Sequence, residues 1–166
     1  MSIGDNWGAT REEQQLDLPC DALLPTGSRR CHRAISIDAP PATTFRWLCQ
    51  LRKAPYSYDL LDNLGRRSPR ALTPGADRLE VGQRFMRIFA LASFDPGEQI
   101  TLLTDSGNTA VTYTTRAEGG GSRLVVRIVL AGSGRLRAAL APALVLGDLL
   151  MMRKQLLTLR ELAEAG

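Results

Sequence analysis

Hydrophobic and polar residues alternate in the segment RAISIDA, where Ile35 and Ile37 flank Ser36. A period of two is typical of a strand with one buried face. The tripeptide APP that follows cannot continue a strand, but proline suits the first turn of a helix. Apolar residues then recur at helical spacing over 42–51, and DLLDNLG fits a second short helix over 59–64.

Beyond Gly75 the pattern changes to strands separated by turns at the spacing of an antiparallel meander. The turns are DPGE, SGN and the glycine run at 119–121, and the predicted strands are QRFMRIFALASF, QITLLTD, TAVTYTTRA and SRLVVRIVLAG. In the last of these, Leu124, Val126 and Ile128 fall on one face, whereas Arg123 and Arg127 fall on the other. This predicts a sheet with one buried and one solvated face.

The segment from Pro142 to Ala165 has the clearest helical pattern in the chain. Its apolar positions follow helical spacing and include Leu149, Met152 and Leu156. Such a face requires a partner, and the buried face of the meander provides one. The pattern therefore predicts an α+β fold with one strand, two short helices, a curved antiparallel sheet and a long C-terminal helix.

The chain has 166 residues, which suits one domain with one core. Residues 1–27 lack a sustained period and are predicted to be a flexible, acidic N-terminal leader, followed by a single domain over 28–166. The remainder is basic, and 19 of the 21 Lys and Arg residues are arginine. The arginines are spread over strands and helices without an aromatic stacking set, so nucleic acid is not an expected partner.

Several classes of function lack their sequence signatures. Three cysteines without CxxC spacing and one histidine, His32, give no metal pattern, and a water-facing position is expected for His32. The chain contains no GxGxxG, no GxxxxGK[ST] and no GxSxG motif, so we expect no cofactor and no Ser-His-Asp set. The apolar run AALAPALVLGDLLMM is interrupted and short, so membrane insertion is not expected. With no signal-peptide pattern, a cytoplasmic location is expected.

The segments ISIDAPPATTFRWL, YSYDLLDNLGRRS, LEVGQRF and GDLLMMRKQLLTLRELAE together resemble the START-like or Bet v 1-like (SRPBCC) superfamily, which includes polyketide cyclase and dehydrase proteins. The resemblance covers roughly residues 30–165. It implies a helix-grip fold, in which the sheet wraps the terminal helix and leaves an apolar cavity. Members bind lipids, sterols, polyketides or other hydrophobic small molecules; some are cofactor-free cyclases and others are carriers.

Two functions follow as hypotheses. The first is binding of a hydrophobic small molecule, and the second is a cofactor-free cyclase, aromatase or dehydratase in which Tyr58, Arg87 and Tyr113 position and polarise the substrate. An arginine such as Arg87 on an inner face would need a carboxylate, a phosphate or a ligand oxygen. Tyr56 and Tyr58 are expected at the pocket mouth, and a homodimer remains open. The candidate ligand-binding residues are Tyr56, Tyr58, Leu61, Phe85, Arg87, Tyr113, Val126, Leu149, Met152 and Leu156.

Overall fold

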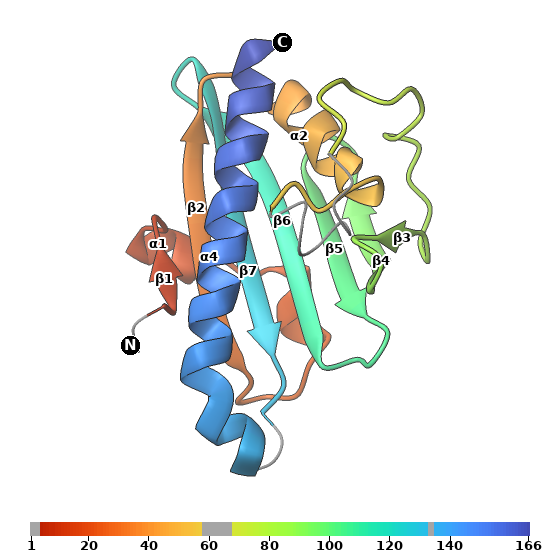
Figure 1. Ribbon diagram of the computed structural model, residues 1–166. Coiled ribbons are helices and arrows are strands. Elements are labelled where there is room, and N and C mark those ends of the chain that lie inside the picture. The colour runs from red at the N-terminus through yellow and green to blue at the C-terminus, as the bar shows by residue number, and fades with distance from the viewer. Residues whose placement is uncertain (1–3, 58–67, 133–134) are drawn as a thin grey trace.

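A computed structural model describes residues 4–57, 68–132 and 135–166 of the chain (Figure 1). A seven-stranded sheet has the order β1-β2-β7-β6-β5-β4-β3, and a long helix, α4 (Arg135–Ala165), crosses one of its faces. The strands are β1 (Asn6–Trp7), β2 (Arg29–Ile37), β3 (Arg84–Phe85), β4 (Phe89–Asp95), β5 (Gln99–Thr104), β6 (Thr109–Glu118) and β7 (Gly121–Leu130). The predicted α+β class and the curved antiparallel sheet are confirmed.

The connection after β2 follows the sequence pattern closely. Helix α2 runs over Pro41–Cys49 and continues as the 3-10 turn η2 (Gln50–Arg52). Pro41 occupies its first turn, where a missing N–H costs nothing. The predicted short helix over 59–64 lies outside the described residues. The terminal helix begins at Arg135, earlier than the predicted Pro142.

The core lies between the inner face of the sheet and the helices. Alternate residues of β7, Leu124, Val126 and Ile128, are buried on this face as predicted, and Leu156 and Leu159 of α4 pack in the same cluster. Strand β2 pairs with β7 from Arg29↔Leu130 to Ile37↔Ser122, which joins the first long strand to the last.

One predicted strand is wrong. QRFMRIFALASF forms two strands, β3 and β4, which reverse through Met86 and Arg87, both with positive φ. The amide of Met86 donates to the carbonyl of Leu51, and Phe85 is fully buried. The residues that usually signal a turn, such as glycine, proline and asparagine, are missing from this reversal, and its residues do not interrupt the hydrophobic pattern. The pattern therefore predicted one continuous strand.

The N-terminal segment also differs from its prediction. Residues 4–27 lie on the sheet rather than apart from it, through β1, α1 (Arg11–Gln14) and the 3-10 turn η1 (Pro19–Ala22) (Figure 1). β1 runs parallel to β2, and a Cβ at Gly8 would collide with the carbonyl oxygen of Ala34. Cys20 and Leu24 pack on outer-face residues of β6 and β7. We call residues 5–24 the N-terminal cover.

Buried arginines hold this cover in place. Arg127 is 1% exposed, and its guanidinium donates to the carbonyls of Leu16, Glu13 and Gln14 and to the Asp21 carboxylate. The Glu13 carboxylate, itself 1% exposed, accepts from Arg123 Nε at 2.9 Å. The prediction of a solvated face at Arg123 and Arg127 is therefore wrong, because the acidic segment covers that face and pairs with its arginines.

The same network shifts the titration of Glu13. Hydrogen bonding from Arg123 is the largest effect and lowers the pKa of Glu13 against the opposing effect of burial. Arg116 Nη2 also donates to Glu13 Oε1, at 2.7 Å. A carboxyl group with a depressed folded-state pKa stabilises the fold above its unfolded pKa, and this contribution is lost as pH falls through the folded pKa.

We predict that Glu13→Gln lowers the free energy of unfolding by about 2–3 kcal/mol near neutral pH, because it leaves the largely buried Arg123 without its carboxylate partner. Urea denaturation followed by circular dichroism measures this loss. The difference from the parent should shrink as pH falls through the folded-state pKa of Glu13, because the parent carboxylate then becomes protonated and neutral as well. Glu12→Gln, on the exposed side of the same helix, is the control and should change stability little. Equal losses in both variants would contradict the network.

Candidate functional site

An apolar pocket of about 240 Å³ lies between α4 and the inner face of the sheet. We call it the sheet–helix pocket. Its lining comes from the start of β4, from β6, β7 and α4, from the β3–β4 turn and from the chain after η2. The residues are Pro55, Ser57, Met86, Ile88, Phe89, Thr109, Val111, Tyr113, Ile128, Met151, Met152 and Gln155.

Strand and helix periods explain the lining. Thr109, Val111 and Tyr113 are alternate residues of β6 and therefore share its inner face. On α4, Met152 and Gln155 are three residues apart and face the same way. The β3–β4 reversal brings Met86 to the same space. Methionine side chains have several rotatable bonds, so this wall can adapt to irregular apolar shapes.

A buried hydrogen-bonded group interrupts the apolar lining. The Tyr113 hydroxyl donates to Gln155 Oε1 at 2.8 Å, and Gln155 Nε2 donates to the carbonyl of Pro55 at 2.6 Å. Gln155 Nε2 also lies 3.3 Å from Met86 Sδ, and Tyr113 and Gln155 are both buried. The pair ties α4 to the sheet and to the chain after η2. It also places a phenol and an amide in the wall of an apolar pocket, where they can orient a ligand oxygen.

The structure brings two of the predicted residues, Tyr113 and Met152, into the pocket lining. Leu149 is half-buried on α4 outside the lining. Three others are fully buried in the core without lining the pocket, namely Phe85, Val126 and Leu156. Tyr58 and Leu61 lie outside the described residues.

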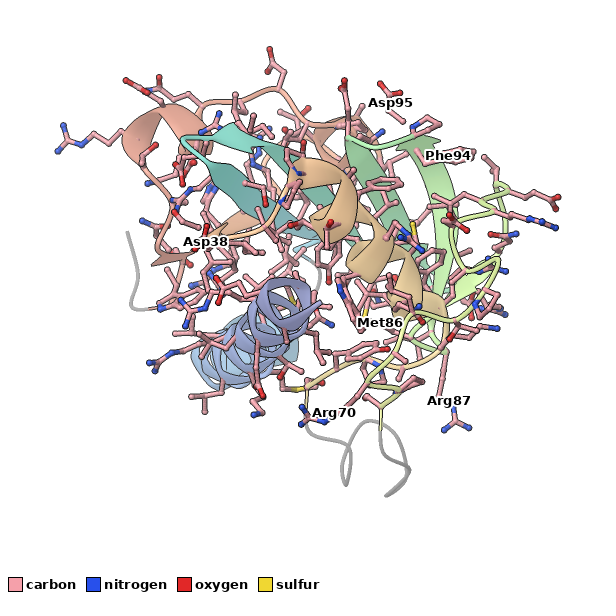
Figure 2. All side chains as sticks on the ribbon, turned by 90° about the horizontal axis from the view of Figure 1, so that it is seen from above. Asp38, Arg70, Met86, Arg87, Phe94 and Asp95 are labelled. Carbon is pink, nitrogen blue, oxygen red and sulfur yellow. The ribbon has the colours of Figure 1, made fainter. Side chains whose placement is uncertain are left out.

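Arg87 does not lie on a strand. It occupies the β3–β4 turn, is exposed, and points away from the body of the protein in Figure 2. The inner face instead carries Arg33 of β2, which alternates with Ile35 and is fully buried opposite Val126. Its Nη1 donates to the carbonyl of His32 at 2.8 Å. Arg33 alternates with Ile35 and Ile37 along the strand, and this period of two indicates in the sequence that Arg33 faces inward.

Tyr56 is an anchor in the core rather than a residue at the mouth of the sheet–helix pocket. It is 1% exposed, with φ 56°, and its hydroxyl donates to the carbonyl of Pro69 at 2.8 Å. Its ring meets Trp47 edge to face, with 6.2 Å between the centroids. These contacts fix the path of the chain as it leaves η2, beside the pocket.

Gln155 was missed because a polar residue on the apolar side of a helix breaks the hydrophobic pattern. Its spacing of three from Met152 nevertheless puts it on the inward face, and that spacing was the available signal. Met86, Ile88 and Phe89 act together because of a turn that the pattern did not reveal.

His32 does not take part in this site. It pairs with Asn6 on the outer face and is half-buried there, so the predicted water-facing position is only partly correct. Burial, followed by the charge of Arg127, lowers the pKa of His32 to about 4. The ring is therefore neutral near neutral pH. Burial likewise raises the pKa of the Cys49 thiol to about 12, so that this side chain is an inert apolar group.

No group of metal-ligating side chains occurs within residues 4–57, 68–132 and 135–166. In the same part of the chain, no helix has the length and apolar character needed to cross a membrane.

Solved structures share this arrangement across most of their length. The KanY protein matches with a TM-score of 0.57 at 14% identity, over 84% of this chain and 99% of KanY. TTHA0849 from Thermus thermophilus matches with a TM-score of 0.51 at 19% identity, over 82% of this chain and 97% of TTHA0849. The Aha1 protein from Colwellia psychrerythraea, solved as a dimer, matches with a TM-score of 0.50 at 15% identity, over 82% of this chain and 97% of Aha1.

The chain has the helix-grip fold. Likeness at these identities shows the fold alone, and this fold is the one that the resemblance to the START-like and Bet v 1-like superfamily implied. No family model and no curated protein sequence matches the chain. At these identities the helix-grip likeness describes architecture, so the function has to be argued from the pocket itself.

The Tyr113–Gln155 pair is testable by a double-mutant cycle. We predict that Tyr113→Phe and Gln155→Met each destabilise the fold, because each leaves a buried polar partner unsatisfied. The double variant should be less destabilised than the sum of the two, with a coupling energy of about 1 kcal/mol from urea denaturation. Additive effects would mean that the hydrogen bond contributes nothing to stability.

Proposed function

We propose that this protein binds a hydrophobic small molecule in the sheet–helix pocket. The observation that supports the proposal best is an apolar pocket with a fixed polar pair, Tyr113 and Gln155, in its wall. Ligand sites are commonly concave and apolar with a few placed polar groups, which is the composition found here. The helix-grip architecture supports the same proposal, because the sheet and α4 enclose the space between them.

The size of the pocket favours a compact ligand. Its volume of about 240 Å³ is close to the lower end of typical ligand pockets, which span about 300–1,000 Å³. Three methionines line it, Met86, Met151 and Met152, and rotation of their side chains can enlarge it.

Binding is better supported than catalysis. Of the residues predicted to position and polarise a substrate, the structure describes Tyr113 and Arg87. Tyr113 lies in the pocket lining, whereas Arg87 is exposed at a turn. The Tyr113 hydroxyl is committed to Gln155, which suits orientation of a ligand better than proton transfer to it.

A matched pair of exposed positions tests the site. Ile88 lines the pocket and is 59% exposed, whereas Val81 is 67% exposed and does not line it. Ile88→Asp should weaken binding of the neutral fluorescent probe N-phenylnaphthylamine about tenfold or more, because it places a carboxylate against an apolar ligand. Val81→Asp should leave the affinity unchanged. Both positions are exposed enough for either variant to fold.

Fluorescence titration measures the dissociation constants in the parent and both variants. Native mass spectrometry of protein purified from its own host then identifies a retained molecule by its mass. Absence of saturable probe binding by the parent, or equal weakening in both variants, would overturn the proposal.

A further inference from the structure

A second cavity, of about 290 Å³, adjoins the sheet–helix pocket. Ser57 lines both cavities, and this shared wall makes them neighbours. We call the second one the basic cavity, and its lining residues are Tyr56, Ser57, Ser68, Arg70, Lys154, Thr158 and Leu162.

Helix α4 serves the two cavities with adjacent stripes of side chains. Lys154, Thr158 and Leu162 are four residues apart and form one stripe along the basic cavity. Met151 and Gln155 form the neighbouring stripe along the sheet–helix pocket. Lys154 and Gln155 are consecutive, so the polar wall of one cavity lies within one helical turn of the apolar wall of the other.

The basic cavity carries positive charge and hydroxyl groups. Arg70 lies beside α4 in Figure 2, and Lys154 faces the same cavity from the helix. Four hydroxyl-bearing residues also line it, Tyr56, Ser57, Ser68 and Thr158, and the hydroxyls of Tyr56 and Thr158 donate to the backbone carbonyls of Pro69 and Lys154. The guanidinium of Arg70 and the ammonium of Lys154 are donors of the kind that a carboxylate or phosphate accepts from.

The nearest carboxylate is a weak competitor. Arg70 Nη1 lies 3.4 Å from Glu161 Oε1, and the two side chains are 71% and 65% exposed. An ion pair this open to water contributes little. Within the described part of the chain, Lys154 has no carboxylate at ion-pair distance. Both cations can therefore turn to an anion that enters the cavity.

We propose that the ligand is an amphiphilic anion, with its apolar part in the sheet–helix pocket and its carboxylate or phosphate group in the basic cavity against Arg70 and Lys154. This rests on the proposed function and narrows its ligand class. The apolar pocket supplies most of the affinity by burying hydrocarbon, and the two cations select the charged end group.

Three probes of equal chain length test the proposal, namely decanoic acid, its methyl ester and decyl phosphate. Each is titrated by displacement of N-phenylnaphthylamine from the parent protein. The acid and the phosphate should bind about fivefold to tenfold more tightly than the ester at low ionic strength. Added sodium chloride should reduce this preference and leave the affinity for the ester unchanged.

Variants then locate the charge effect. Lys154→Gln and Arg70→Gln should each weaken binding of the two anions about threefold to fivefold without changing binding of the ester, and Lys154→Arg should retain anion binding. Glu161→Gln should tighten anion binding, since it removes the competing carboxylate. Arg153→Gln is the matched control, because it removes one charge from the same turn on the side where Arg153 lies over Trp7, 5.9 Å from the ring centroid.

The outcomes separate this proposal from the proposed function. If the ester binds as tightly as the anions, or if Arg153→Gln weakens anion binding as much as Lys154→Gln does, the anion subsite is overturned while the apolar pocket stands. If none of the three probes displaces the neutral dye and the dye itself does not bind, the proposed function fails and the subsite fails with it.

Discussion

The pairing of β2 with β7 is the constraint on which the rest of the structure depends. It joins nine residue pairs between segments about a hundred positions apart and fixes which residues of each strand face inward. Its far end is tight, because a Cβ at Gly121 would collide with the carbonyl oxygen of Ile37. α4 then follows β7 onto the inner face, and the N-terminal cover leads into β2 across the outer face.

Four consecutive residues of α4 show how one helix serves several surfaces. Met152 faces the core, Arg153 lies over Trp7, Lys154 lines the basic cavity, and Gln155 holds Tyr113. Successive side chains of a helix are about 100° apart, so one turn reaches every direction around its axis. A shift of α4 by one residue would disturb the hydrophobic contacts, the polar pair and both cavities together.

Much of this architecture was predictable from periodicity. The alternation around Ile35 and the helical spacing of Met152 and Leu156 identified the elements, and Tyr113 and Met152 were found as inward-facing candidates for the same reason. Periodicity reports burial without distinguishing core from pocket wall. Val126 and Leu156 therefore have the same sequence pattern as the pocket-lining residues, although both are packed fully inside the core.

What escaped prediction depends on distant partners or on unmarked turns. Arg127 has the sequence pattern of a solvated residue, and only its contacts with residues more than a hundred positions away reveal that it is buried. The sequence did contain a local signal for α1, since Thr10 and Glu13 form a capping box. Gln155 and the turn at Met86 lacked the hydrophobic signature on which the interpretation relied.

The two ends of the sheet share a further property. Each is closed by a strand of only two residues, β1 at one edge and β3 at the other. A long unpaired edge is a template onto which another chain can add a strand, and short edge strands deny it that template. β1 also covers part of β2, which is nine residues long and would otherwise form one edge of the sheet. The N-terminal cover thereby gives the protein a defence against edge-to-edge aggregation, so trimming it from the chain would favour self-association.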